Sequence, residues 1–82
     1  MIFLIEYNRA EGRIVTFKPF DDADRVKAEK LRLDIELDLS RKSIDNEVVL
    51  LEAASEEALR RTHRRYFEDA SKIRQSISDN AA

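Results

Sequence analysis

Apolar and charged residues alternate strictly along Leu31-Arg32-Leu33-Asp34-Ile35-Glu36-Leu37-Asp38-Leu39. A period of two is typical of a half-buried strand. However, residues 26–30 contain no turn residue, and Lys27, Ala28, Glu29 and Lys30 favour a helix. Because a helix rarely runs into a strand without a turn residue, we interpret residues 22–41 as one helix. The alternative is a strand over residues 31–39.

The helical interpretation places apolar residues on two nearly opposite sides of the helix, at about 100° per residue. One stripe consists of Ala23, Val26, Leu33 and Leu37. The other consists of Ala28, Leu31, Ile35 and Leu39. A helix with two apolar sides needs cover on both. We therefore expect this chain to have more apolar surface than it can bury by itself.

Strands are predicted on both sides of this helix. Residues 2–7 and 13–18 are rich in β-branched and aromatic side chains, and Gly12 in the connector between them suits a hairpin loop. We expect Pro19 to end the second strand. Residues 47–53 contain four consecutive apolar residues and form the third strand. Both faces of residues 2–7 are apolar, so we place this strand in the centre of the sheet.

A second helix is expected over residues 56–70, with Ser55 as its N-cap and two glutamates in its first turn. The predicted fold is therefore α+β with the order ββαβα. Its three-stranded antiparallel sheet has strand order 2-1-3, and two helices pack on one face. The alternative is ββαββα, with residues 31–39 as a strand. We expect one domain over residues 1–70, followed by a fraying helix end and a disordered tail over residues 71–82.

The composition of this chain of 82 residues excludes several kinds of site. It has no Cys, which removes disulfides, thiolate zinc sites and cysteine nucleophiles. A single Gly cannot build a phosphate-binding glycine-rich loop. The formal net charge is −2, so no overall positive field attracts nucleic acid or an anionic membrane. We expect a cytoplasmic protein that is not an enzyme, with no metal, no cofactor and no membrane segment.

The second predicted helix carries an arginine ridge. Arg60, Arg61, Arg64 and Arg65 lie within a sector of about 140° at helical spacing. Such side chains can bind phosphates or carboxylates, but each also has an acidic residue four positions away. The ridge is therefore interpreted first as a solvated face of ion pairs, then as a site for a charged protein partner, and last as a nucleic-acid site.

His63 is the only histidine, and it lies at the edge of the apolar side of the second predicted helix. We expect it to be partly buried and hydrogen-bonded, although a general base or a pH switch would use the same residue type. If it is functional, it belongs with the arginine ridge in a partner-binding surface.

These observations favour a small non-enzymatic binding or assembly module. It would form a homodimer through apolar sheet or helix surface and present the arginine ridge to a protein partner. The residues assigned to the dimer interface are Leu31, Ile35, Leu39, Phe3 and Ile5. One alternative is a nucleic-acid-binding accessory protein that uses the arginine ridge. Another is a small enzyme or ligand binder that uses His63, Tyr66 and an arginine.

Overall fold

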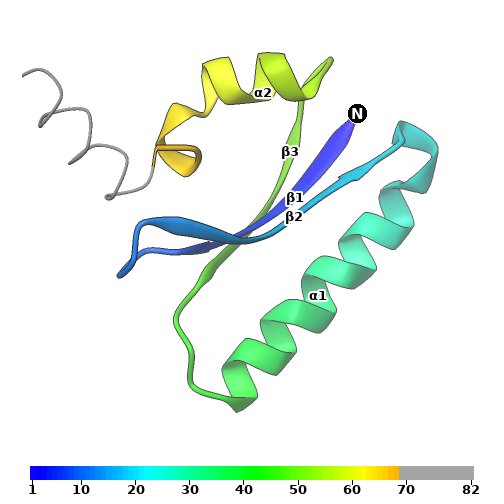
Figure 1. The fold of residues 1–82 in the computed structure, drawn as a ribbon. Coiled ribbons are helices and arrows are strands. Elements are labelled where there is room, and N and C mark those ends of the chain that lie inside the picture. The colour runs from blue at the N-terminus through cyan, green and yellow to red at the C-terminus, as the bar shows by residue number, and fades with distance from the viewer. Residues whose placement is uncertain (69–82) are drawn as a thin grey trace, which may run out of the picture.

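The computed structural model describes residues 1–68, which fold into one open sheet with a helix on each side (Figure 1). The elements are β1 (Ile2–Asn8), β2 (Arg13–Phe20), a 3-10 turn (Asp22–Asp24), α1 (Arg25–Arg41), β3 (Glu47–Glu52), α2 (Glu56–Thr62) and a second 3-10 turn, η2 (Arg64–Tyr66). Because α1 includes residues 31–39, the helical prediction is confirmed and the four-stranded alternative is wrong. The predictions for residues 69–82 lie outside the described residues.

The sheet has the predicted strand order, β2-β1-β3, and both pairings are antiparallel. β1 is central because both of its faces are apolar, and its residues from Ile2 to Tyr7 are all buried. The β1–β2 hairpin closes at Gly12, which has φ 65° and donates its N–H to the Asn8 carbonyl at 2.8 Å. A glycine adopts this left-handed conformation without steric cost.

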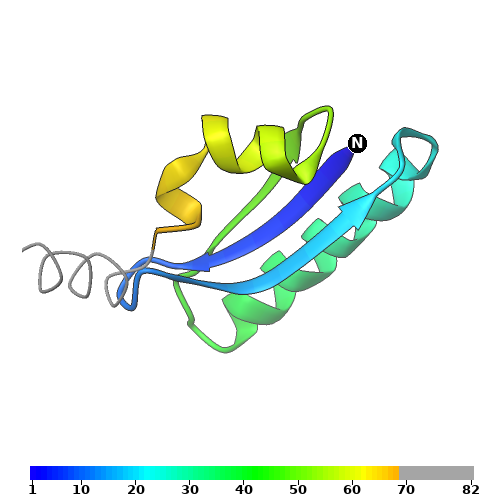
Figure 2. The same ribbon diagram turned by 45° about the horizontal axis from the view of Figure 1, so that its top comes forward.

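The two helices cover opposite faces of the sheet, which corrects the prediction that both pack on one face (Figures 1 and 2). Phe3, Ile5 and Tyr7 share a core with Leu59 of α2 and Tyr66 of η2. Successive side chains of a strand point to opposite faces, so the fully buried Ile2 and Leu4 lie on the other face, under α1. The physical reason is the sequence of β1 itself: a strand that is apolar on both faces needs a helix on each.

Only one of the two apolar stripes of α1 faces the sheet. Ala28 and Leu39 are buried, and Leu31 and Ile35 are half-buried. The remaining apolar side chains form an outer stripe that is largely exposed: Val26 (78%), Leu33 (54%) and Leu37 (49%). The expected surplus of apolar surface is therefore present over residues 1–68.

α2 begins as predicted, because the Ser55 hydroxyl caps it by accepting from the Ala58 N–H at 3.1 Å. It ends at Thr62, however, so the predicted helix over residues 56–70 was too long. The α-helical conformation stops at His63, and the chain continues as the 3-10 turn η2. This break allows the Tyr66 ring to pack edge-on against Tyr7, with centroids 5.3 Å apart. The tertiary contact of Tyr66 thus overrides the local helical pattern.

Candidate functional site

The arginine ridge is divided between two elements and is largely paired with carboxylates. Arg60 and Arg61 lie on α2, whereas Arg64 and Arg65 lie on η2 beyond the break. Of the four pairs expected from the i,i+4 spacing, three fall within residues 1–68 and all three are present: Arg60–Glu56 at 3.0 Å, Arg61–Glu57 at 3.0 Å and Arg64–Glu68 at 3.9 Å. The fourth, Arg65 with Asp69, lies outside the described residues. Arg65 contacts Glu47 at 2.8 Å. The ridge therefore presents ion pairs rather than four free cations.

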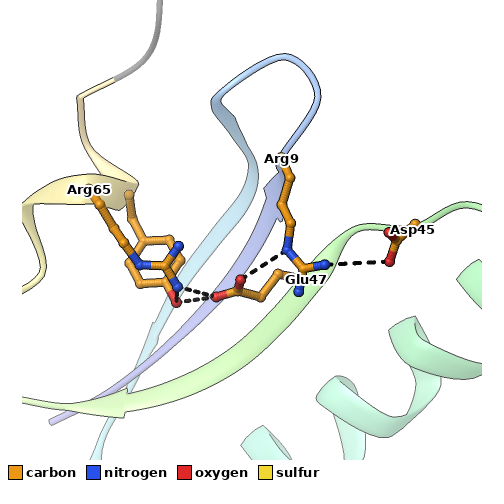
Figure 3. A network of polar contacts seen from close by, with 5 residues as sticks. Arg9, Asp45, Glu47 and Arg65 are labelled. Carbon is orange, nitrogen blue, oxygen red and sulfur yellow. Dashed lines mark hydrogen bonds and ion pairs between the residues drawn. The ribbon is translucent and has the colours of Figure 1, made fainter.

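Glu47 at the start of β3 is the centre of a polar cluster that joins three parts of the chain (Figure 3). Arg9, just after β1, donates from Nε to Glu47 Oε1 at 3.2 Å, and its Nη1 lies 3.7 Å from Asp45. Arg65 and the hydroxyl of Tyr66 both donate to Oε2. Arg65 also donates to the Tyr66 hydroxyl at 2.7 Å. These contacts fix η2 to the beginning of β3.

The protonation behaviour of the cluster indicates a structural role. The hydrogen bond from Tyr66 lowers the pKa of Glu47, assisted by Arg9 and Arg65, against the opposing effect of burial. Burial raises the pKa of Tyr66, and its hydrogen bond to Glu47 adds to this shift. Glu47 is thus held as a carboxylate whose two oxygens are both occupied. A carboxylate in this state is a poor proton acceptor, and we call the cluster the clamp because its contacts hold η2 against β3.

A pocket of about 390 Å³ lies between η2 and β3. It is lined by Leu51, Thr62, His63, Arg64, Arg65 and Tyr66. His63 is half-buried as expected, but its ring makes no hydrogen bond with any of residues 1–68. Thr62 donates its hydroxyl to the Ala58 carbonyl. Among residues 1–68, the pocket lining therefore brings no hydroxyl into a hydrogen bond with the His63 ring.

Of the residues assigned to a dimer interface, three are buried within the single chain and two, Leu31 and Ile35, are half-buried. Phe3 and Ile5 are buried beneath α2, at 1% and 0% exposure. Leu31, Ile35 and Leu39 lie on the sheet-facing side of α1. The surface of Phe3, Ile5 and Leu39 is thus used within the monomer, whereas Leu31 and Ile35 keep part of theirs exposed. Among residues 1–68, accessible apolar surface remains on the outer stripe of α1, on the half-buried β3, and at three exposed side chains elsewhere: Met1, Val15 and Ile44.

The open edge of the sheet at β3 exposes backbone hydrogen-bonding groups. Met1 and Ala53 exchange two hydrogen bonds across β1 and β3, at 3.0 and 3.1 Å. Such doubly bonded pairs alternate with non-bonded pairs along an antiparallel ladder. In the observed register the N–H and C=O groups of Val49 and Leu51 therefore point toward β1, and the same groups of three residues point outward: Val48, Leu50 and Glu52. Within residues 1–68 no strand lies beyond β3.

The opposite edge, at β2, carries features that discourage pairing. Pro19 lies opposite Phe3. The backbone N–H and C=O of Phe3 point toward β3, so the backbone of Pro19 faces outward, away from β1. Proline has no N–H to donate at this outward position. The register shift opposite Glu6 and Tyr7 also distorts this side of the sheet. Proteins use prolines and bulges to protect edges in this way. β3 has no proline and carries four consecutive aliphatic residues.

Sequence reasoning did not single out Glu47, Arg9 or the outward backbone groups of β3. The period-two pattern does place Glu47 on the same face as Val49 and Leu51, where a charged residue needs a partner. That signal was available, but the identity of the partners was not, because Arg9 and Arg65 lie 38 and 18 positions away along the chain. The outward backbone groups depend on the hydrogen-bond phase between β1 and β3, which side-chain patterns do not specify.

Over residues 1–68 the structure contains no group of three or more histidine or acidic side chains arranged to hold a metal ion. Neither helix in this part of the chain has an apolar stretch long enough to cross a bilayer. Comparison of the chain with models of protein families, with curated proteins and with solved structures gave no match.

Proposed function

We propose that this chain is a small non-enzymatic assembly module that forms a homodimer through the open edge of β3. The single observation that carries the proposal is the contrast between the two edges of the sheet. The β2 edge has a proline at an outward position, whereas the β3 edge has outward N–H and C=O groups flanked by Val48, Val49, Leu50 and Leu51. An unprotected, aliphatic edge strand is a template for another strand.

Pairing through β3 would also bury apolar surface that so small a domain leaves exposed. A domain of this length buries only a modest share of its apolar surface, and association is a common way to bury more. The side chains from Val48 to Leu51 are all half-buried in the single chain. A second strand beside β3 would cover them and satisfy the outward backbone groups together.

The proposal is tested by the mass of the particle in solution, measured by light scattering across a range of protein concentrations. The wild-type chain should approach twice its 9.6 kDa mass as the concentration rises. Leu50→Pro removes an outward N–H that β1 does not use, so the monomer should fold while dimerisation is lost. Leu50→Ala shortens the same side chain but keeps the N–H, and it is the matched control that should still dimerise.

Two results would contradict the proposal. One is a wild-type chain that remains at 9.6 kDa at the highest concentration. The other is a dimer that Leu50→Pro and Leu50→Ala weaken equally, because backbone pairing at this edge would then contribute nothing. Val49→Pro serves as a folding control: its N–H points toward β1, so this substitution should disrupt the sheet itself.

The arginine ridge supports the remaining part of the proposal, the presentation of a charged helix to a protein partner. Its ion pairs do not favour the alternative of nucleic-acid binding, because phosphates would have to displace Glu56, Glu57 and Glu68. That alternative predicts binding to DNA or RNA at low salt that weakens steeply as salt is added. The absence of a gel shift even at low salt would remove it.

A further inference from the structure

The sequence of β3 is compatible with pairing to a second copy about an axis at Leu50. A two-fold axis perpendicular to the sheet at Leu50 places Leu50 opposite its counterpart and Val49 opposite Leu51 of the second copy. Val48 then lies opposite Glu52, so the outward residues of the two copies form doubly bonded pairs. In this register no glutamate lies directly opposite another glutamate, an arrangement that would be destabilising. β3 is thus self-complementary about its own centre.

α1 lies near this axis, because it packs against β3 and β1 rather than β2. Strands are about 4.8 Å apart, so an axis beside β3 lies about 2.4 Å from that strand. A helix seated midway between β3 and β1 is then about 5 Å from the axis. The α1 helices of the two copies would lie roughly 10 Å apart, which is the usual separation of packed helices.

One side of α1 faces the open edge, and it carries alternating charges. Arg25 identifies this side, because it forms an ion pair with Glu52 of β3. At about 100° per residue, three further charged residues share the side with it. We call this set the mixed-charge flank: Arg25, Glu29, Arg32 and Glu36. All four are exposed in the single chain.

The order of charges on the mixed-charge flank is self-complementary under the same symmetry. A two-fold axis makes two copies of α1 antiparallel and brings the same flank of each together. If the axis passes between Lys30 and Leu31, Arg25 lies beside Glu36 of the second copy, and Glu29 lies beside Arg32. Every contact across the axis then joins opposite charges. Moving the axis by two residues along α1 would instead bring Arg25 beside Arg32, or Glu29 beside Glu36, of the second copy.

The centre of symmetry of α1 and that of β3 coincide along the chain direction. Leu50 precedes Glu52 by two residues, which is about 6.6 Å along a strand. The Arg25–Glu52 ion pair aligns the start of α1 with the end of β3. The same distance of about 6.6 Å, counted from Arg25 toward the C-terminal end of α1 at about 1.5 Å per residue, ends between Glu29 and Lys30. This point lies within about 2 Å of the centre required by the charges.

Resting on the proposed function, we infer that the partner of β3 is a second copy bound about a two-fold axis at Leu50. The two sheets join into one antiparallel sheet of order 2-1-3-3-1-2. The two α1 helices pack antiparallel on one face of this sheet, with Arg25 paired with Glu36 and Glu29 paired with Arg32 between copies. The outer stripe of α1 points away from this contact and takes no part in it.

The test uses two full-length variants with opposite charge on the mixed-charge flank. R25E/R32E makes the flank wholly acidic, and E29K/E36K makes it wholly basic. Each variant alone should dimerise at least about tenfold more weakly than wild type, because four attractive pairs become repulsive. An equimolar mixture should form the heterodimer with near wild-type affinity, and native mass spectrometry distinguishes it by mass. K27E/R41E changes charge equally on the other flank of α1 and should dimerise like wild type.

The outcomes separate this inference from the proposed function. Wild-type chains that stay monomeric overturn both. If wild type dimerises and both charge variants dimerise equally well, the two-fold contact of α1 is overturned and pairing at β3 remains. The same holds if wild type dimerises but the two variants form no heterodimer on mixing. A dimer that K27E/R41E disrupts as strongly as R25E/R32E also overturns the inference, since net charge alone would then explain the effect.

Discussion

Replacing Leu59 with Ala should destabilise the domain severely, because this is the fully buried side chain of α2. Leu59 is 0% exposed and packs with Phe3, Ile5, Tyr7 and Tyr66. Burying a leucine contributes about 1.5–3 kcal/mol, and the cavity left by truncation raises the cost to about 3–5 kcal/mol. At about 0.05–0.15 kcal/mol per residue, the 68 described residues correspond to a total stability of roughly 3–10 kcal/mol. Leu59→Ala should therefore remove a large part of the free energy of unfolding.

The assay is urea unfolding followed by far-ultraviolet circular dichroism at 25 °C, at a concentration low enough to keep the chain monomeric. Leu33→Ala is the matched control, because it makes the same change in a helix at a position that is 54% exposed. Leu33→Ala should lower the free energy of unfolding by less than about 1 kcal/mol. Leu and Ala have similar helix propensity, so the comparison of the two variants reports burial rather than helix formation. Equal losses for the two variants, or a loss below about 1 kcal/mol for Leu59→Ala, would refute the assignment of buried faces.

Three further predictions concern the clamp and the end of α1. Tyr66→Phe should lower the free energy of unfolding by about 1–2 kcal/mol, because Glu47 loses a charge-assisted hydrogen bond; an unchanged urea midpoint would contradict this. The pKa of Glu47 is lowered from its ordinary 4.5, so its contribution is complete above about pH 4.5 and is lost as the pH falls through the lowered value. Acid titration of wild type should therefore show a larger loss of stability than Glu47→Gln. Ser43 has φ 56°, so Ser43→Gly should raise the melting temperature by a few degrees, and a lower value would oppose this reasoning.

The sheet was predictable from the sequence because β1 is apolar on both faces. A strand of this kind must be central, and a central first strand with a helical connection between the other two gives the order 2-1-3. The same observation also implied a helix on each face, which the sequence analysis did not conclude. The ambiguity over residues 31–39 was resolved by the absence of a turn residue after Val26.

The candidate site was less predictable, because it depends on contacts between distant residues. The i,i+4 pairs of Arg60, Arg61 and Arg64 follow from local spacing and were predicted. The pairing of Arg65 with Glu47 was not, because it requires the helix to break at His63. Similarly, the two stripes of α1 were identified from their spacing, but nothing local indicates which one faces the sheet. That choice is made by tertiary packing and by the connection to β3.

The claim that a second copy closes the edge of β3 is tested most directly by amide hydrogen exchange of Val48, Leu50 and Glu52 at increasing protein concentration. These N–H groups face outward, so they should exchange rapidly in dilute solution and become protected as dimers form. The amides of Val49 and Leu51 bond to β1 and should be protected at every concentration. Outward amides that still exchange rapidly where light scattering detects a dimer would contradict the account.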